Sequence, residues 1–464
     1  MKRESENTLN RILPRRHALI KPSTSNLRSQ DLAWGIVAVV AAFGTYFCTY
    51  GLRKPFTVAA YENQFLGPWA MKSVLVLTQV VGYTLSKIIG IKVIAEMRRG
   101  RRALVLCGMI AVAEAALVLF AVTPPTWSFV FLFVNGLMLG MVFGLVLGFL
   151  EGRRLTEALV AGLCASFILA DGVTKSVGAW VLQAGVTEAW MPAVAGGLFL
   201  PPLLICVGVL SRVPPPSLDD QKARHERTPM NSRQRRSVLR RYWVTLGSIT
   251  TIYLMVTVLR SFRADFAPEL WQALGADVVP STFSRSEMWV AFGVLVINGA
   301  AVLVSNNVRA FLTSLVTCGL GLALIAAVLV DQASGNVLPA FPFMVLMGLG
   351  LYLPYVAIHT TVFERFLAMT RAEGNIGYLM YVVDAAGYLG YVVTLAVKDQ
   401  ILASGDAVVF FNRFGLATVC ISAVCLLIIA IRYRFDLAGD VADTASDPNV
   451  DMSPSRHPAA ATTT

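Results

Sequence analysis

The sequence predicts an all-α integral membrane protein with twelve transmembrane helices in two six-helix halves. Of its 464 residues, 56% are hydrophobic and only 14% are charged, which leaves too little polar surface to cover a soluble globule. Apolar runs of about 20 residues, the length that crosses a hydrocarbon core, recur along the chain, and the cations gather in every second connection between them. A transmembrane β-barrel would instead show alternating segments of about ten residues, which the sequence lacks.

The predicted spans fall into two groups of six, separated by a polar stretch. They begin near Ala33, Val74, Ala103, Trp127, Leu159, Met191, Trp243, Met288, Phe311, Phe341, Ile376 and Val408. The predicted parts are a basic cytoplasmic arm (1–31), an N-terminal half (32–212), a cytoplasmic linker (213–241), a C-terminal half (242–435) and a cytoplasmic tail (436–464). The linker is rich in Arg, Pro and Ser without an apolar period, which predicts a flexible connection, and the arm and tail are polar enough to be disordered. A mitochondrial transit peptide is the alternative for the arm, but Glu4 and Glu6 interrupt its basic pattern.

The positive charges predict the orientation. Twenty-eight of the 39 Lys and Arg lie in the arm, the linker, the C-terminal end from Arg432 onward and the connections after even-numbered spans, whereas Lys72, Arg285, Lys398 and Arg413 lie on the other side. By the positive-inside rule, both termini of this multi-pass membrane protein are predicted to be cytoplasmic. This distribution accounts for the net charge of +11 without a nucleic-acid partner.

The seven cysteines lie inside apolar runs and show no metal-ligand spacing, so they are predicted to pack as small hydrophobic side chains. The sequence predicts no metal and no cofactor. The expected partners are a small anionic solute and membrane lipids, and we expect a monomer.

Two arginines at matched positions predict a ligand site. The stretch TYFCTYGLRKPF (45–56) resembles IYLMVTVLRSFR (252–263) in outline, and Arg53 and Arg260 are 207 residues apart, near half the chain length. Equivalent helices of two repeated halves face one cavity at the membrane midplane, so the two arginines should converge on one ligand. Lys54 and Arg263, which lie beside them in sequence, belong to the same predicted substrate-binding set.

Further charges lie inside predicted spans two and five. Lys87, in GYTLSK (82–87), is roughly 13 Å from the cytoplasmic end of its span, so it either extends to the interface or contributes to the ligand site. In span five, Asp171 and Lys175 are four residues apart on one face and should form an ion pair, which makes their burial less costly.

Spans eight and nine hold almost nothing ionisable and are predicted to face lipid. Span ten is expected to be broken by Pro354, with His359 following as either a satisfied polar residue or a proton carrier.

Span eleven offers a candidate proton carrier. Asp384 is the only acid in GNIGYLMYVVDAAGYLGY (374–391), and Tyr381 and Tyr388 share its helical face. Asp171 and Asp265 each have cations nearby in sequence, whereas Asp384 has none, and desolvation without a nearby cation favours a protonated carboxyl. If transport is coupled to protons, Asp384 is therefore expected to carry the proton, and in an anion exchanger it is expected to be structural.

Short motifs carry a resemblance to known families. The loop GIKVIAEMRRGRR (90–102) resembles the conserved loop of the major facilitator superfamily, with Glu96 where an aspartate is usual. YGLRKPFTVAA resembles the first-helix signature of the organophosphate:phosphate antiporter family, with Pro55 in place of an asparagine. YTLSK and LRSFRADFAPEL are similar to its second and seventh helices. The stretches EGRR, LADG and GNIGYLMY look more like an uncharacterised bacterial branch of the superfamily.

The resemblance implies an antiporter in which Arg53 and Arg260 clasp a phosphate and Lys87 supports them. Asp171 departs from the family, which has a histidine at about that place. The predicted function is secondary active transport of a small organic anion, phosphorylated or carboxylated, by alternating access, since guanidinium groups suit both kinds of anion. The alternative is a transporter-like membrane sensor of such an anion. An enzyme is not expected, because the sequence shows no His/Asp acyltransferase pair, no metal cluster and no Gly-rich phosphate loop.

The topology can be tested with a reporter that is active only in the periplasm. Fused after Tyr433, it should stay silent, because both chain ends are predicted to be cytoplasmic. Activity at this position would mean that the number of spans is odd.

Overall fold

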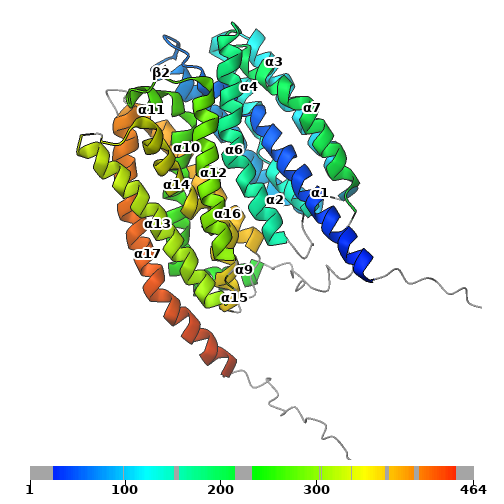
Figure 1. The fold of residues 1–464 in the computed structure, drawn as a ribbon, viewed down its shortest axis with the longest axis vertical. Helices are drawn as coiled ribbons and strands as arrows, with labels where there is room; N and C mark the ends of the chain where they lie inside the picture. The colour runs from blue at the N-terminus through cyan, green and yellow to red at the C-terminus, as the bar shows by residue number, and fades with distance from the viewer. Residues whose placement is uncertain are drawn as a thin grey trace, which may run out of the picture.

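The structure, a computed structural model, is a bundle of long helices in two side-by-side halves (Figure 1). It describes residues 24–97, 99–150, 156–214, 232–302, 304, 306–335, 337–370, 376–401 and 407–445. The first helix begins and the last helix ends at the same end of the bundle, called the lower end here, as Figure 1 shows. The predicted orientation makes this end cytoplasmic.

The N-terminal half holds six spans and a small hairpin at the upper end. Its elements are α1 (Thr24–Gly51), the 3₁₀ turn η2 (Pro55–Val58), β1 (Phe65–Leu66), β2 (Trp69–Ala70), α2 (Met71–Glu96), α3 (Arg99–Val122), α4 (Pro125–Leu139), α5 (Val142–Leu150), α6 (Thr156–Gln183) and α7 (Met191–Arg212). The antiparallel strands pair Phe65 with Ala70 and Leu66 with Trp69. Helices α4 and α5 together form one span.

The C-terminal half repeats this plan. Its elements are α9 (Ser232–Arg241), α10 (Trp243–Asp265), α11 (Ala267–Ala273), α12 (Pro280–Val302), α13 (Asn307–Ala333), α14 (Ala340–Ala357), the π-helical turn η3 (Ile358–Val362), α15 (Phe363–Met369), α16 (Ile376–Ile401) and α17 (Ala407–Ala445). The elements from α14 to α15 form one span. The halves pack against each other along α6 with α12 and along α2 with α16.

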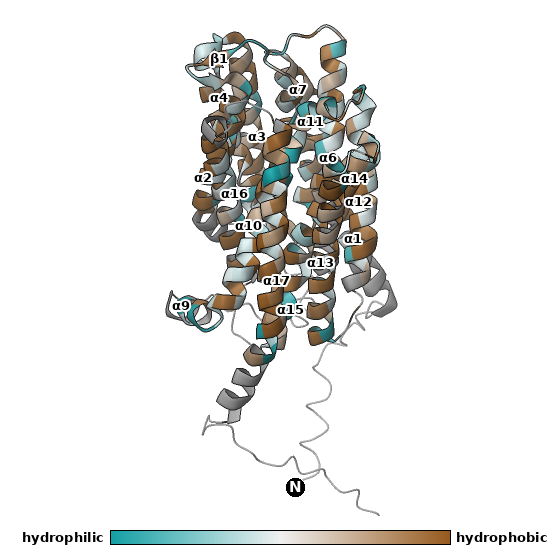
Figure 2. Ribbon diagram, turned by 90° about the vertical axis from the view of Figure 1, so that its left-hand side faces the viewer, coloured by the Kyte–Doolittle hydropathy of each residue, from teal (hydrophilic) through white to brown (hydrophobic). Residues whose placement is uncertain are grey.

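The spans follow the hydrophobic pattern of the sequence. Within the described residues, nine spans are long and apolar enough to cross a membrane, and apolar side chains such as Leu104 and Val316 are exposed on their outer faces. In Figure 2, where the ribbon is coloured by hydropathy, the long helices are mostly hydrophobic and α9, at the lower end, is hydrophilic. The long helices α6, α12 and α16 run beside these nine, and each carries a buried acid. The predicted all-α membrane fold is confirmed.

Several predicted boundaries differ from the observed ones. α1 starts at Thr24 inside the predicted arm, α17 continues to Ala445 inside the predicted tail, and α9 lies inside the predicted linker. An apolar run marks the membrane crossing, whereas the helical hydrogen bonds continue wherever polar residues have adequate helix propensity. The described part of the chain leaves out residues 1–23, 151–155, 215–231 and 446–464. The stretch EGRR falls within 151–155 and is therefore outside it.

Two corrections concern the C-terminal half. α12 begins at Pro280 rather than near Met288, since proline suits the first helical position. This start brings Glu287 into the bundle, where it is buried, so the prediction that span eight holds almost nothing ionisable and faces lipid is wrong. Span ten is not broken at Pro354 either, because α14 runs past it to Ala357 and continues as the π turn.

Within the N-terminal half, α2 and α4 pack backbone against backbone. A Cβ atom at Gly136 would collide with the carbonyl oxygen of Gln79, and one at Gly82 would collide with that of Phe133. Small residues at a membrane helix contact allow such close approach. The two helices therefore form a rigid base next to the end of α1.

The end of α1 is anchored by two buried amides on this base. The Nδ2 group of Asn135 on α4 donates to the carbonyl oxygens of Leu52 and Ala113, both at 3.1 Å. Gln79 on α2 donates to the carbonyl of Arg53 at 3.1 Å and to Oδ1 of Asn135 at 2.9 Å. The last carbonyls of a helix lack intrahelical partners, so these amides complete the hydrogen bonds of α1 and fix the position of Arg53.

Replacing Asn135 by alanine should lower stability markedly. Asn135→Ala removes the donor to the buried carbonyl of Leu52, which lies just past the end of α1, at a cost of about 1–3 kcal/mol, and also removes the contacts to Ala113 and Gln79. The unfolding temperature in detergent measures the loss. Asn298→Ala is the matched control, because this buried amide donates only to Val294 in its own helix, so its removal should cost much less. Equal effects of the two substitutions would contradict the anchoring role.

Candidate functional site

Arg53 lies against two tyrosines at mid-height of the bundle. Its guanidinium carbon is 3.8 Å from the ring centre of Tyr83 and 5.7 Å from that of Tyr50. Tyr83 is twelve residues below the start of α2, roughly 18 Å along the helix axis, and thirteen residues above its end. This places the arginine near the middle of the span, where cation–π contacts replace part of its lost hydration.

Arg260 has the corresponding position in the other half. Its guanidinium carbon is 4.3 Å from the ring centre of Tyr355 and 5.6 Å from that of Tyr352, both on α14. Its Nη2 group reaches the hydroxyl of Ser261 at 3.3 Å. Tyr50 and Tyr388 both lie within electrostatic range of Arg53 and Arg260, which shows that the two arginines approach one region from the two halves.

Lys87 joins the halves below this region. Its Nζ forms an ion pair with Oδ2 of Asp384, and it lies 5.1 Å from the ring centre of Tyr83 and 4.7 Å from that of Tyr388. The rings of Tyr83 and Tyr388 are themselves 5.0 Å apart. Lys87 therefore faces the interior, and the alternative that it extends to the interface does not hold.

Asp384 also belongs to a hydrogen-bond chain within the C-terminal half. The Tyr253 hydroxyl donates to Oδ1 of Asp384 at 2.6 Å and is 2.6 Å from Nε2 of His359. Because this hydroxyl has one proton, which it gives to Asp384, the Nε2–H of His359 donates to the tyrosine oxygen. His359 lies in η3, and such π turns are frequent at functional sites.

Above the arginines, three lysines of the N-terminal half hold one segment of the C-terminal half. This upper ion-pair layer comprises Lys54 paired with Asp265, Lys72 paired with Glu269, and Lys175 donating to the carbonyl of Ala264. Lys175 also pairs with Asp171 on its own helix, as predicted from their spacing, and Tyr391 donates to Asp265 at 2.9 Å. The halves are thus joined at the upper end of the bundle by polar contacts of these three lysines.

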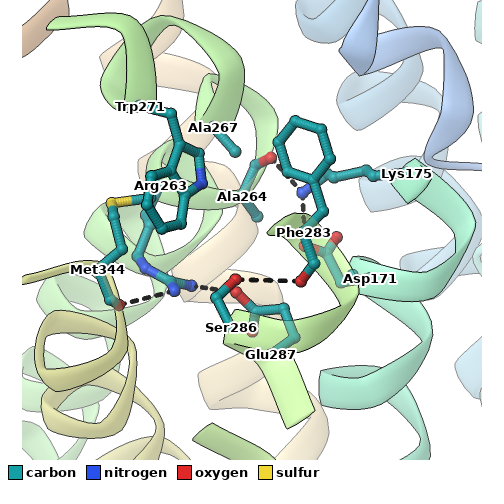
Figure 3. Close-up of a pocket in the computed structure, with 11 residues that line it drawn as sticks. Asp171, Lys175, Arg263, Ala264, Ala267, Trp271, Phe283, Ser286, Glu287 and Met344 are labelled. Atoms are coloured by element: carbon teal, nitrogen blue, oxygen red, sulfur yellow. Dashed lines mark hydrogen bonds and ion pairs between the residues drawn. The ribbon is translucent and has the colours of Figure 1, made fainter. Parts of the chain in front are cut away.

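A small cavity lies between α6 and α12 next to this layer (Figure 3). It has room for about one water molecule and is lined by Asp171 and Lys175 from one half and by Arg263 and Glu287 from the other. Glu287 accepts from Nη1 of Arg263 at 2.8 Å, and Nη2 of Arg263 donates to the carbonyl of Met344 at 2.9 Å.

The buried cations divide into two groups. In the part of the chain that the structure describes they are Arg53, Lys54, Lys72, Lys87, Lys175, Arg260 and Arg263. Five of them form an ion pair with an acid. Among the described residues, Arg53 and Arg260 have no acidic partner, and each keeps a buried Nε without a hydrogen-bond acceptor. We call these two arginines, with Lys87 and the tyrosines that contact them, the central site. The tyrosines are Tyr50, Tyr83, Tyr352, Tyr355 and Tyr388.

The predicted site residues therefore separate by location. Lys54 and Arg263 are neutralised by acids away from the central site, whereas Arg53, Lys87 and Arg260 lie around it. The premise that Asp384 lacks a nearby cation is wrong, because the fold brings Lys87 to it from another helix. The side chain of Tyr381 lies outside the described residues.

Sequence reasoning singled out Tyr388 but missed Tyr50, Tyr352, Tyr355 and Glu287. Tyr50 stands three residues before Arg53, and Tyr352 and Tyr355 stand seven and four residues before His359, so their helical spacing was a usable signal. No sequence signal pointed to Glu287, because the apolar run of its span starts one residue later, at Met288.

The arrangement defines a class of membrane protein: two six-helix halves around a polar centre, the fold of major facilitator transporters. Solved structures with this fold include a bacterial homologue of the human lysosomal transporter Spinster, in an inward-facing and unoccupied conformation (TM-score 0.55, 13% identity, covering 89% of this chain and 98% of that one). A D-xylose–proton symporter (0.55, 13%, covering 85% of this chain and 96% of that one) is similar to the same degree. The nucleoside transporter NupG (0.54, 14%, covering 86% and 99%) is a further example.

The chain belongs to a family of unknown function, DUF5690, whose sequence pattern matches residues 55–435. No curated protein sequence matches it. The comparisons support the major facilitator fold, and the closer resemblance to organophosphate:phosphate antiporters stays a prediction.

The ion pair between Lys87 and Asp384 can be tested by neutralising each partner. Lys87→Met leaves a buried carboxylate without its cation and should cost about 3–5 kcal/mol of stability, as should Asp384→Asn, whereas the double variant should recover most of the loss. Unfolding temperatures in detergent give the comparison, with the exposed Arg309→Met as control. Additive losses in the double variant would show that the two charges are not coupled.

Proposed function

We propose that this protein is a secondary transporter that binds a small organic anion between Arg53 and Arg260 and moves it by alternating access of its two halves. One observation carries the proposal: five buried cations have an acidic partner, and among the described residues only these two arginines lack one. An uncompensated buried charge is costly, so two of them facing one region favour a negatively charged ligand that is present for part of the transport cycle.

The charges of the central site favour a dianion. Arg53, Lys87 and Arg260 supply three positive charges and Asp384 one negative charge, so the formal balance is +2. A phosphate monoester or a dicarboxylate would neutralise it. Planar guanidinium groups bind either anion through two parallel hydrogen bonds, and the hydroxyls of Tyr50, Tyr83 and their neighbours are additional donors.

The solved relatives support transport as the class of activity. They are named as a symporter and transporters of chemically different solutes, which agrees with one fold that serves many solutes. The arginines lie near the midplane and come from equivalent helices of the two halves, where alternating access requires its binding site to be. We place the protein in the bacterial cytoplasmic membrane with both termini inside.

Lysine substitutions test the arginine pair. Arg53→Lys or Arg260→Lys keeps the charge but loses the paired hydrogen bonds, so affinity for a bound dianion should fall about ten- to a hundredfold. Phosphate monoesters and dicarboxylates can be screened for thermal stabilisation of the purified protein. Labelled hits can then be tested for uptake into proteoliposomes.

Arg285→Lys is the matched control, because this exposed arginine lies in the same half away from the central site. It should leave both affinity and uptake unchanged. Unchanged anion affinity in Arg53→Lys and Arg260→Lys would remove the pair from the site. Binding without uptake would favour the sensor instead of a transporter.

A further inference from the structure

The contact between α6 and α12 contains two acids whose free oxygen atoms line one cavity. Oε2 of Glu287 and Oδ1 of Asp171 are both buried and have no hydrogen-bond donor, and both residues line the small cavity of Figure 3. Glu287 is 94% buried and Asp171 is 97% buried. Buried acceptors without donors are rare and costly, so this pair calls for a donor.

The two helices meet closely at this point. A Cβ atom on Gly172 would lie 2.7 Å from Cβ of Glu287 and 2.5 Å from the carbonyl oxygen of Phe283. Gly172 follows Asp171 directly, so closure of the contact brings the acid of the N-terminal half to the acid of the C-terminal half. Since α6 and α12 belong to different halves, the same contact opens whenever the halves separate at the upper end.

We propose that Asp171 and Glu287 share one proton when the contact between α6 and α12 is closed and release it when the contact opens. A proton on either carboxyl becomes a covalent O–H, the donor that the two acceptors lack, acting directly or through one water molecule. Two ionised carboxylates in one cavity also repel each other, which a single proton relieves. This inference rests on the proposed function in one respect: it requires that the two halves move apart, as they do in alternating access.

A proton fits this site better than a metal ion. The cavity holds about one water molecule, and the cations Lys175 and Arg263 also line it, so an additional metal cation would be repelled. The charged and titratable groups that face Glu287 are Arg263 from α10, Asp171 and Lys175 from α6, and Tyr352 from α14. Lys54 lies 3.7 Å from Oδ1 of Asp171.

The sign of the pH effect follows from this arrangement. The closed form binds one proton more than the open form, so acid favours closure and alkali favours opening. For a single proton, the ratio of open to closed molecules changes by at most about tenfold per pH unit.

The equilibrium between the open and the closed contact can be followed by the distance between the upper ends of α6 and α12. This measurement requires no solute. Spin labels at Ala184→Cys and Ser281→Cys, both exposed positions, would be placed in a full-length chain without its native cysteines. Their distance distribution is then measured from about pH 5 to about pH 9 in lipid nanodiscs. We expect the long-distance population to rise with pH, and a distribution that is independent of pH would overturn the proposal.

Variants assign the response to these acids. Glu287→Gln should abolish the pH response, and Glu287→Asp should restore it with a shifted midpoint. Asp277→Asn, at an exposed acid just before α12, is the control and should leave the response unchanged. If Glu287→Gln does not fold, Asp171→Asn tests the same shared proton with the pair of Arg263 and Glu287 intact. An unaltered response in Glu287→Gln or Asp171→Asn rules out the shared proton, whatever the outcome of the arginine substitutions at the central site.

Discussion

The cost of a charge inside a membrane is the constraint on which this structure depends. An isolated ion in a low-dielectric interior requires a partner, and five buried cations have one. Arg53 and Arg260 lie against tyrosine rings instead, which lowers the cost of burial but does not neutralise the charge. The proposed function rests on this difference, because an anion bound between the two arginines would supply the missing negative charge.

The fold could be predicted from sequence patterns, because a chain that crosses a bilayer must have apolar runs of a certain length and cations on one side. Apolar runs and the distribution of cations were enough to give the spans and their division into halves, and these depend on composition rather than on contacts. Helix ends were predicted less well, as α1 and α12 show, because the hydrogen-bond ladder of a helix does not stop where hydrophobicity changes.

The site was only partly predictable, because many of its contacts join residues that are far apart in the sequence. The ion pair of Asp171 and Lys175 spans four residues and can be inferred from helical spacing. The pair of Lys87 and Asp384 spans 297 residues, and no local pattern connects them. An inference about Asp384 that used only its own helix therefore left out Lys87, its ion-pair partner on α2. Arg53 and Arg260 were found because a repeat, unlike a contact, is visible in sequence.

The contacts within a half and between the halves differ in kind. Inside the N-terminal half, α2 and α4 meet through glycines, and the buried amide of Asn135 completes the backbone hydrogen bonds, so separating them would expose apolar surface and unpaired carbonyls. Between the halves, Lys54, Lys72 and Lys87 pair with acids. When water enters such a contact, the loss of the ion pair is largely offset by hydration of both charges. Rigid halves joined by ionic contacts can therefore separate and rejoin at low cost, as alternating access requires.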